Sequence, residues 1–255
     1  MILPIEMHVT PSKNTTASRS AVPSDLDEAL LEQVWVVMAA YNESVHVFDT
    51  VQSLRPQFTN IVIVDDGSSD DTYEQACRSG AKALRHVINR GQGAALQTGI
   101  NYAVSKGASY VVTFDSDGQH SPQDALAMLH RIHNSENLDI VLGSRFLEHS
   151  SSVPFLRKLL LRAAIVFTKL TTGLNLTDTH NGLRVFTREA ASRICITMDR
   201  MAHASQILDE VSRLDLRYAE FPVRITYTDY SKGKGQTNSA AFRVLMEYLL
   251  GRITK

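Results

Sequence analysis

The sequence has few of the features that mark secreted or nucleic-acid-binding proteins. Cysteine occurs only twice in 255 residues. Neither Cys77 nor Cys195 lies in a zinc-binding or redox motif. We therefore expect no disulfide scaffold and a reduced, intracellular chain. The net charge is −1, which provides no bulk attraction for nucleic acid, so we expect no nucleic-acid partner.

Long apolar segments are also absent. The first ten residues, MILPIEMHVT, lack the basic region and apolar core of a signal peptide. No uninterrupted apolar run approaches the roughly 18 residues that a membrane-spanning helix needs. We therefore expect a protein that is soluble or lies on a membrane surface.

The chain divides into three parts by composition. Residues 1–33 predict a flexible arm, rich in Ser, Thr, Asn and Pro over residues 10–24, followed by a short helix over 25–33 that Ser24 could cap. We expect the main domain, an α/β unit, over residues 34–236. Residues 237–255 predict an amphipathic C-terminal helix, because their large apolar residues recur at helical spacing.

Short apolar runs alternate with helical patterns between residues 34 and 146. Gly80 is well placed to end one helix, and Ser121 with Pro122 to begin another. This alternation predicts an α/β fold with a mainly parallel, Rossmann-like sheet flanked by helices. Strands are predicted at 34–40, 60–68, 81–89, 108–118 and 138–146, and helices at 44–54, 71–80, 93–107 and 121–134.

Polar clusters follow three of the predicted strands. Ligands of parallel sheets bind beyond the carboxyl ends of the strands, so we expect these clusters to meet in one site. They are Tyr41-Asn42-Glu43 after the first strand, Asp65-Asp66 at the end of the second, and Asp115-Ser116-Asp117 at the end of the fourth.

The triplet Asp115-Ser116-Asp117 predicts a metal site. Two carboxylates this close repel each other unless a cation or a proton separates them. Hard oxygen ligands suit Mg²⁺ or Mn²⁺, which keep waters and bridge substrate phosphates. Asp115, Asp117 and Gln119 are the candidate metal ligands. An isolated triplet of this kind is also compatible with a solvated acidic turn.

Two further segments carry weaker signals. Asp65 and Asp66 could accept hydrogen bonds from a base or a ribose hydroxyl, or could form a turn and a helix cap. The segment NRGQG (89–93) precedes a helix, and its glycines would let a phosphate approach the helix N-terminus. Its spacing matches neither a P-loop nor a dinucleotide fingerprint.

Taken together and in order, five segments resemble the family 2 glycosyltransferases with the GT-A fold. They are AYNE, VDDGSSD, NRGQGAALQTG, FDSDGQH and GSRF. The closest likeness is to the dolichyl- or polyprenyl-phosphate sugar transferases, and it extends from about Val34 to Gln236. It implies a metal on the diphosphate at Asp117 and Gln119, with Asp115 beside them. The nucleotide site it implies comprises Ala40, where the family often has Pro, with Tyr41, Asn42, Glu43, Asp65, Asp66, Gly93, Asp115 and Ser116.

The resemblance also implies an acceptor site in the second half. Arg145 would bind an acceptor phosphate, although a surface ion pair is an alternative. Arg162 would be a second such arginine, in a segment (154–170) that suits either an interfacial helix on anionic lipid or a core helix with a charged edge. The segment TDTHNGLRVFTREA (177–190) resembles the family's Asp-x-x-x-Gly-x-Arg stretch near the reaction centre. It implies Asp178 and Arg184 as catalytic residues.

Other polar residues of the second half are weaker candidates. Asn181 could belong to the site or to a tight turn. His180 and His203 are not predicted to act as bases, since such histidines are more often partly buried and hydrogen-bonded. The pair Asp209-Glu210 lies in a helical pattern and cannot be placed at the reaction centre.

The function implied is inverting transfer of a hexosyl unit from a GDP- or UDP-sugar to a polyprenyl or dolichyl phosphate. A lipid phosphate is already anionic and needs positioning more than deprotonation. Related enzymes often carry transmembrane helices after the catalytic domain, so we expect a membrane surface or a separate small membrane protein as partner, at the cytoplasmic face. The residues expected to be catalytic are Asp117, Arg145, Arg162, Asp178 and Arg184.

Two alternatives remain open. One is a metal-dependent glycosyltransferase that acts on a sugar hydroxyl in polysaccharide or cell-wall glycan synthesis, which would need a general base. The other is a non-enzymatic scaffold domain that keeps the fold. A dehydrogenase is disfavoured because the first strand leads into AYNE rather than a Gly-x-Gly-x-x-Gly loop.

Overall fold

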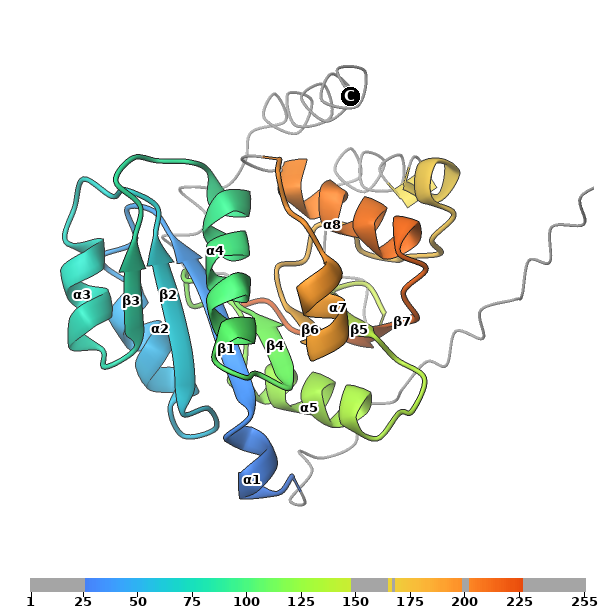
Figure 1. Ribbon diagram of the computed structural model, residues 1–255, viewed down its shortest axis with the longest axis horizontal. Helices are drawn as coiled ribbons and strands as arrows, with labels where there is room; N and C mark the ends of the chain where they lie inside the picture. Colours follow the sequence, from blue (N-terminus) through green and yellow to red (C-terminus); the bar gives the residue numbers. More distant parts are fainter. Residues whose placement is uncertain (1–25, 148–164, 167, 199–201, 227–255) are drawn as a thin grey trace, which may run out of the picture.

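The computed structural model of the chain describes residues 26–147, 165–166, 168–198 and 202–226 (Figure 1). Several predictions fall outside the described residues: the flexible arm, the part of the amphipathic segment that contains Arg162, and the C-terminal helix over 237–255. Within the described residues, no helix combines the length and the apolar character that a membrane crossing requires.

The core of the fold is a seven-stranded sheet with the order β3-β2-β1-β4-β6-β5-β7. Neighbouring strands are parallel except at β6, which pairs antiparallel with both β4 and β5. The predicted mainly parallel sheet is therefore confirmed. The strands are β1 Val34–Ala40, β2 Asn60–Asp65, β3 Lys82–Arg85, β4 Tyr110–Thr113, β5 Ile140–Ser144, β6 Arg184–Thr187 and β7 Tyr218–Pro222.

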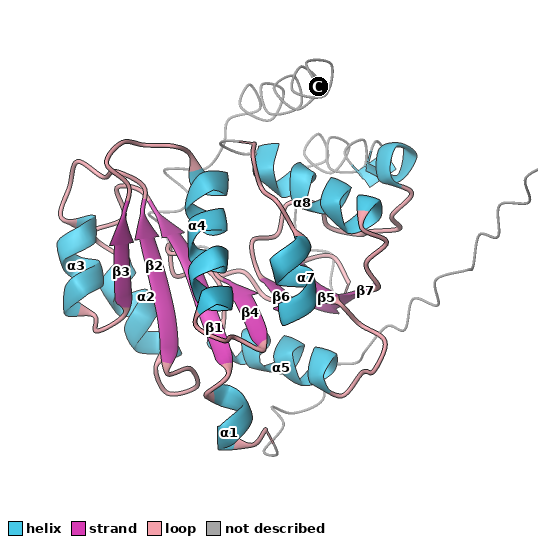
Figure 2. Cartoon of the chain, viewed as in Figure 1, coloured by secondary structure: helices cyan, strands magenta, loops and turns pink. Residues whose placement is uncertain are grey.

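Helices cover both faces of the sheet (Figure 2). Side chains of α2, α3 and α5 join the hydrophobic cluster on one face, and those of α4, α7 and α8 join the cluster on the other. The helices are α1 Glu28–Leu31, α2 Val47–Leu54, α3 Thr72–Arg78, α4 Gln92–Ser105, α5 Pro122–His133, α7 Arg188–Arg193 and α8 Ala202–Arg213.

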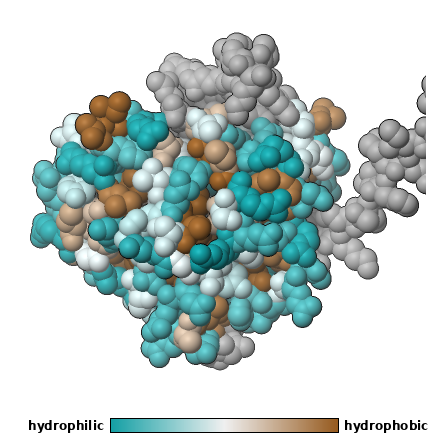
Figure 3. Space-filling model, viewed as in Figure 1, coloured by the Kyte–Doolittle hydropathy of each residue, from teal (hydrophilic) through white to brown (hydrophobic). Residues whose placement is uncertain are grey.

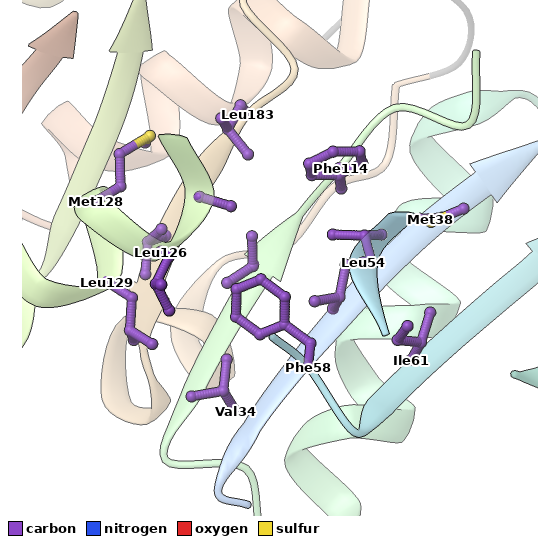
Figure 4. Close-up of a cluster of buried hydrophobic side chains, with 14 of the residues drawn as sticks. Val34, Met38, Leu54, Phe58, Ile61, Phe114, Leu126, Met128, Leu129 and Leu183 are labelled. Atoms are coloured by element: carbon purple, nitrogen blue, oxygen red, sulfur yellow. The ribbon is translucent and has the colours of Figure 1, made fainter. Parts of the chain in front are cut away.

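Strand β1 explains why the apolar runs are continuous rather than alternating. Val34 and Met38 point into the cluster with Leu54 of α2 (Figure 4). Val37 and Ala39, at the intervening positions, belong to the cluster on the opposite face. A strand that is buried on both faces needs an apolar side chain at nearly every position.

The helix ends follow local backbone chemistry. Gly80 follows the C-cap of α3 with φ of 80°, and Ser121 is the N-cap of α5 with Pro122 in its first turn, as predicted. The predicted cap of α1 is wrong. Asp27, not Ser24, is the N-cap, because its carboxylate accepts a hydrogen bond from the backbone N–H of Ala29 at 3.3 Å.

Gly99 lets α4 pack closely against β1, which generates a prediction. A Cβ atom on Gly99 would lie 2.4 Å from Cγ1 of Val37. We expect Gly99→Ala to lower the free energy of unfolding by about 1–2 kcal/mol, because overpacking outweighs the gain in helix propensity. Urea unfolding measures it. Asn101→Ala, on the exposed face of the same helix, is the control and should change stability by roughly 0.5 kcal/mol or less. Unchanged or increased stability of Gly99→Ala would contradict this account of the packing.

Candidate active site

A cavity of about 650 Å³ lies at the carboxyl end of the central strands. The loops after β1, β2 and β4 form part of its wall, and the starts of α4, β6 and α8 form the rest. The predicted site residues that line it are Ala40, Tyr41, Glu43, Asp66, Asp115, Ser116, Asp117 and Arg184. It is also lined by Ala39, Asn89, Gly91, Gln92, His180, Gly182, His203 and Ala204.

The remaining predicted residues do not line the cavity. They are Asn42, Asp65, Gly93, Gln119, Arg145 and Asp178, whereas Arg162 lies outside the described residues. Three polar strand ends thus meet in one site, as the alternation of strands and helices predicts.

Strand β6 places the Asp115 carboxylate. The antiparallel register pairs Thr113 of β4 with Arg184 of β6. Continued by two residues, this register sets Asp115 opposite Gly182. The hydroxyl of Thr113 donates to the Gly182 carbonyl at 2.8 Å. A Cβ atom on Gly182 would lie 2.3 Å from both carboxylate oxygens of Asp115, so only glycine leaves room for this carboxylate.

Cationic neighbours set the charge of Asp115. Burial raises its pKa, but a hydrogen bond from His120 and the charges of Arg184 and His203 outweigh burial, so the pKa lies below its ordinary value. The His120 Nε2 to Asp115 Oδ2 distance is 2.9 Å, and the imidazole is 2% exposed. Asp115 is therefore held as an oriented carboxylate.

Asp117 has the opposite environment. Burial and then the charge of Asp115 raise its pKa, and Glu43 adds to the effect, while a hydrogen bond from the Gln119 backbone N–H opposes it. The two acids of the triplet are thus driven apart in pKa, which is how repelling carboxylates behave without a cation between them.

These carboxylates fit a divalent cation that a substrate helps to bind. Within the described part of the chain, no group of three His, Cys, Asp or Glu side chains is arranged to hold a metal ion. Mg²⁺ is commonly held by only one or two protein carboxylates together with substrate phosphates and water. Asp117 suits such a ligand, because a cation would relieve the repulsion that raises its pKa. The Gln119 side chain does not line the cavity.

Arg184 supplies the positive charge of the cavity. It begins β6, and it is only 2% exposed. Burial lowers its pKa to about 10, although Asp115 and Asp178 oppose that shift, so it remains protonated at neutral pH. Its buried Nη1 forms no hydrogen bond with any described residue. A buried charged donor of this kind is costly unless a ligand satisfies it.

Asp66 fastens the loop that precedes α4. Its carboxylate accepts hydrogen bonds from the backbone N–H groups of Arg90 at 2.9 Å and Gly91 at 2.7 Å. Gly91 has φ of 90° and lines the cavity. Gly93 faces elsewhere, since a Cβ there would lie 2.2 Å from the Met198 carbonyl oxygen. Within the segment 89–93, the glycine that lines the cavity is therefore Gly91 rather than the predicted Gly93.

Asn42 and Asp65 support the site without lining the cavity. The backbone N–H of Asn42 donates to the Ser68 hydroxyl at 2.9 Å, and its side-chain oxygen accepts from the Ser69 N–H at 3.0 Å. Asp65 is fully buried and pairs with Arg85 at 3.1 Å. Both residues join loops to one another and do not face the cavity.

Arg145 and Asp178 form an ion pair beside the site. Nε and Nη2 of Arg145 donate to the Asp178 carboxylate at 2.7 and 2.8 Å. Burial raises the Asp178 pKa, but Arg145 outweighs it, and the net direction is downward. Glu220 of β7 accepts from the backbone N–H groups of Thr177 and Asp178. This edge of Arg145 is therefore engaged within the protein, and its predicted role at an acceptor phosphate stays a prediction.

Two histidines that were not predicted to act as bases, His180 and His203, line the cavity. Burial lowers the pKa of His180, despite the neighbouring Asp178, and its Nδ1 lies 2.7 Å from the Thr179 hydroxyl. His203 comes from the start of α8, far along the chain. The signal for His180 was its place inside the Asp-x-x-x-Gly-x-Arg stretch, whereas no local pattern marks His203.

A Rossmann-like sheet with an Asp-x-Asp triplet at the carboxyl end of β4 is typical of glycosyltransferases with the GT-A fold. The profile described as Glycosyl transferase family 2 matches residues 35–195. The chain belongs to this family and is a glycosyltransferase. The alternative of a non-enzymatic scaffold domain is therefore disfavoured.

Two relatives illustrate the family. A UDP-N-acetylglucosamine–dolichyl-phosphate N-acetylglucosaminyltransferase from Methanococcus voltae is 29% identical, covering 87% of this chain and 97% of the relative. A dolichyl-phosphate beta-glucosyltransferase from Dictyostelium discoideum is 31% identical, covering 85% and 75%.

A solved structure supports the fold. Glucosyl-3-phosphoglycerate synthase from Mycobacterium tuberculosis, in complex with Mn²⁺ and UDP-glucose, aligns with a TM-score of 0.65 at 19% identity. The alignment covers 88% of this chain and 82% of the synthase. At this identity the likeness shows a shared GT-A fold.

The contact between Gly182 and Asp115 generates a prediction. We expect Gly182→Ala to displace the Asp115 carboxylate and to lower kcat/KM for sugar transfer by about 100-fold, the usual effect of a shift near 1 Å in an active site. Gly173→Ala is the control, because a Cβ atom there would meet no described atom within 4 Å, while its positive φ (74°), which Gly182 does not share, gives it a backbone strain of its own. Equal activity of the two variants, with circular dichroism showing both folded, would exclude the proposed role of Gly182.

The raised pKa of Asp117 generates a prediction about stability. Its folded pKa lies above the unfolded value, so the folded state binds more protons and stability falls as pH rises through the folded pKa. Asp117→Asn should therefore raise the free energy of unfolding at pH 7 without metal, by roughly 1 kcal/mol or less given its partial exposure. Thermal unfolding with and without Mn²⁺ measures this. A variant less stable than wild type without metal would refute the repulsion.

Proposed function

We propose that the protein transfers a hexosyl unit from a GDP- or UDP-sugar to a polyprenyl or dolichyl phosphate, with inversion at the anomeric carbon. The observation that carries the proposal is the buried Arg184, whose Nη1 has no hydrogen-bond partner among the described residues, in a cavity that also holds Asp115 and Asp117. This combination suits a diphosphate that binds with a divalent cation. The activities named for the two relatives support the lipid phosphate acceptor.

The donor would lie across the three strand ends. Tyr41, Asp66 and Gly91 line the part of the cavity formed by β1, β2 and the loop before α4, which suits the nucleoside. The diphosphate would lie between Asp117 and Arg184. A bound Mg²⁺ or Mn²⁺ would neutralise charge that develops on the departing diphosphate. Arg184 would donate to the same oxygens from a preorganised position.

The acceptor would need positioning more than deprotonation. A phosphate monoester carries a charge of about −1.5 to −2 at neutral pH and is itself nucleophilic. Attack from the side opposite the diphosphate would break the anomeric bond with inversion. Arg145, which Asp178 holds in place, would orient this phosphate. Arg162, outside the described residues, would be the second arginine to bind it.

The hydroxyl-acceptor alternative has less support. It would need a carboxylate as general base beside the acceptor. The pair Asp209-Glu210 lies on α8 and does not line the cavity. Glu210 accepts hydrogen bonds from Arg213 at 2.9 and 2.8 Å. This pair is therefore not in place to act as the base.

A location at the cytoplasmic face of a membrane fits this function. Cys77 and Cys195 are free, exposed thiols, which suit a reducing compartment. We therefore propose a peripheral enzyme whose partners are a nucleotide sugar and a membrane-borne lipid phosphate.

A donor screen tests the function. GDP- and UDP-hexoses are incubated with the protein and with membranes that contain polyprenyl phosphate, with and without Mn²⁺. We expect a glycolipid product that requires both the metal and the lipid phosphate. Transfer that survives EDTA or Asp117→Ala would sink the metal role. If Arg145→Ala and Arg162→Ala leave lipid transfer intact, the proposed acceptor site fails.

The role of Arg184 has a separate test. We expect Arg184→Gln to lower kcat by about 100- to 1,000-fold, as loss of one preorganised donor does, and to weaken UDP binding. Arg184→Lys keeps the charge and should recover part of the binding. Arg193→Gln, at an exposed position of α7, is the control. Unaltered UDP affinity of a folded Arg184→Gln protein would contradict the diphosphate contact.

A further inference from the structure

Within the described residues, the exposed large hydrophobic side chains gather at the end of the molecule that carries the cavity. Two of them are in the loop after β1, two in the loop between β3 and α4, and two in the helical residues 165–166 and 168–172. Both loops follow the carboxyl ends of parallel strands, and the helical stretch, yellow in Figure 1, lies at the same end. They are Tyr41, Val45, Val87, Ile88, Val166 and Leu170.

The most prominent of these groups is the loop between β3 and α4. Val87 is 99% exposed and Ile88 is 69% exposed. Figure 3 shows a hydrophobic patch at the upper left, over this loop. The next residue, Asn89, lines the cavity. Val87 and Ile88 therefore form an apolar tip on the rim of the active site.

The tip is held by a rigid base. Asp66 binds the backbone N–H groups of Arg90 and Gly91, and its Oδ1 lies 2.7 Å from Nδ1 of His86. Gly67 packs beneath the loop, where a Cβ atom would lie 2.8 Å from the Asn89 nitrogen. The loop is thus anchored on both sides of two apolar side chains that project into solvent. Contiguous exposed apolar surface of this kind marks interaction sites.

The charge around the tip indicates the partner. Of the basic residues near the tip, Arg85 pairs with Asp65 and Glu74, whereas Arg90, two residues after Ile88, is exposed. On the other side of the cavity, Val166 and Leu170 are four residues apart in a helical stretch, so they share one face, with exposed Lys169 beside them. Apolar side chains flanked by basic ones suit the surface of an anionic bilayer.

We infer that the Val87–Ile88 tip inserts into an anionic lipid bilayer and acts as a second membrane contact, opposite the helical residues 165–166 and 168–172. The two contacts would set the carboxyl end of the sheet, and hence the cavity, against the membrane surface. The inference deepens the proposed function, because it states how the enzyme would reach a membrane-borne acceptor. Membrane binding is nevertheless measured without donor or acceptor, so either idea can fail alone.

Vesicle binding tests the inference. The full chain is sedimented with vesicles of phosphatidylcholine alone or with vesicles that contain about 30% phosphatidylglycerol. Neither kind of vesicle contains polyprenyl phosphate. We expect wild type to bind the anionic vesicles, and V87S combined with I88S to bind at least tenfold more weakly. UDP affinity should stay unchanged, because both side chains lie outside the cavity lining. Leu170→Ser should weaken binding separately.

The two ends of α4 offer matched controls. Arg90 precedes α4, and Lys106 follows its 14 residues, about 20 Å away. Arg90→Gln should weaken vesicle binding, whereas Lys106→Gln should not. Tryptophan fluorescence of Val87→Trp should shift to the blue and be quenched by brominated lipid, whereas that of Ser105→Trp should not.

Three results would overturn the inference. The first is wild-type protein that does not bind anionic vesicles. The second is equal binding by wild type and the V87S and I88S double variant. The third is a double variant that loses self-association in sedimentation velocity while its vesicle affinity is unchanged, which would assign the tip to a second copy of the chain. Failure of lipid-linked transfer with intact vesicle binding would count against the proposed function alone.

Discussion

The contact between the Asp115 carboxylate and the Gly182 backbone is the constraint on which the site depends. It exists because β6 enters the sheet antiparallel between β4 and β5. That register pairs Thr113 with Arg184, so the acid that follows β4 and the arginine that begins β6 are fixed relative to one another. A side chain at position 182 would occupy the space of the carboxylate. The glycine and the arginine of the Asp-x-x-x-Gly-x-Arg stretch thus serve one geometric purpose.

The charges of the cavity divide the work of the triplet. Asp115 is surrounded by His120, Arg184 and His203, and these neighbours keep it ionised. Asp117 lies beside acids, and its charge is disfavoured. Two carboxylates with pKa values pushed apart have different tasks. Asp115 is best placed to orient neighbouring groups, and Asp117 to receive a cation that arrives with a diphosphate.

The sequence predicted local features well and tertiary ones poorly. Apolar runs such as VWVVMAA identify strands that are buried on both faces, and the acids at their ends identify the edge where ligands bind. Strand β6 was not predicted, because its four residues are too few to establish a strand pattern and the Asn181-Gly182 pair before it is compatible with either a site or a tight turn. For the same reason the carboxylate-to-glycine contact was beyond reach: it depends on the partner strand. His203 belongs to the site only through the packing of α8.

Several predicted ligands bind neighbouring loops and do not line the cavity, and the reason is general. A side chain at a strand end can point into the cavity or bind the adjacent loop, and sequence spacing does not distinguish the two. Asp65 and Asn42 bind loops, whereas Asp66 does both, because it lines the cavity and fastens Arg90 and Gly91. Since the same hydrogen bonds hold the apolar tip beside Asn89, one carboxylate couples the proposed nucleotide side of the cavity to the proposed membrane contact. The carboxyl edge of the sheet therefore combines the proposed donor site with the surface that would meet the acceptor's membrane.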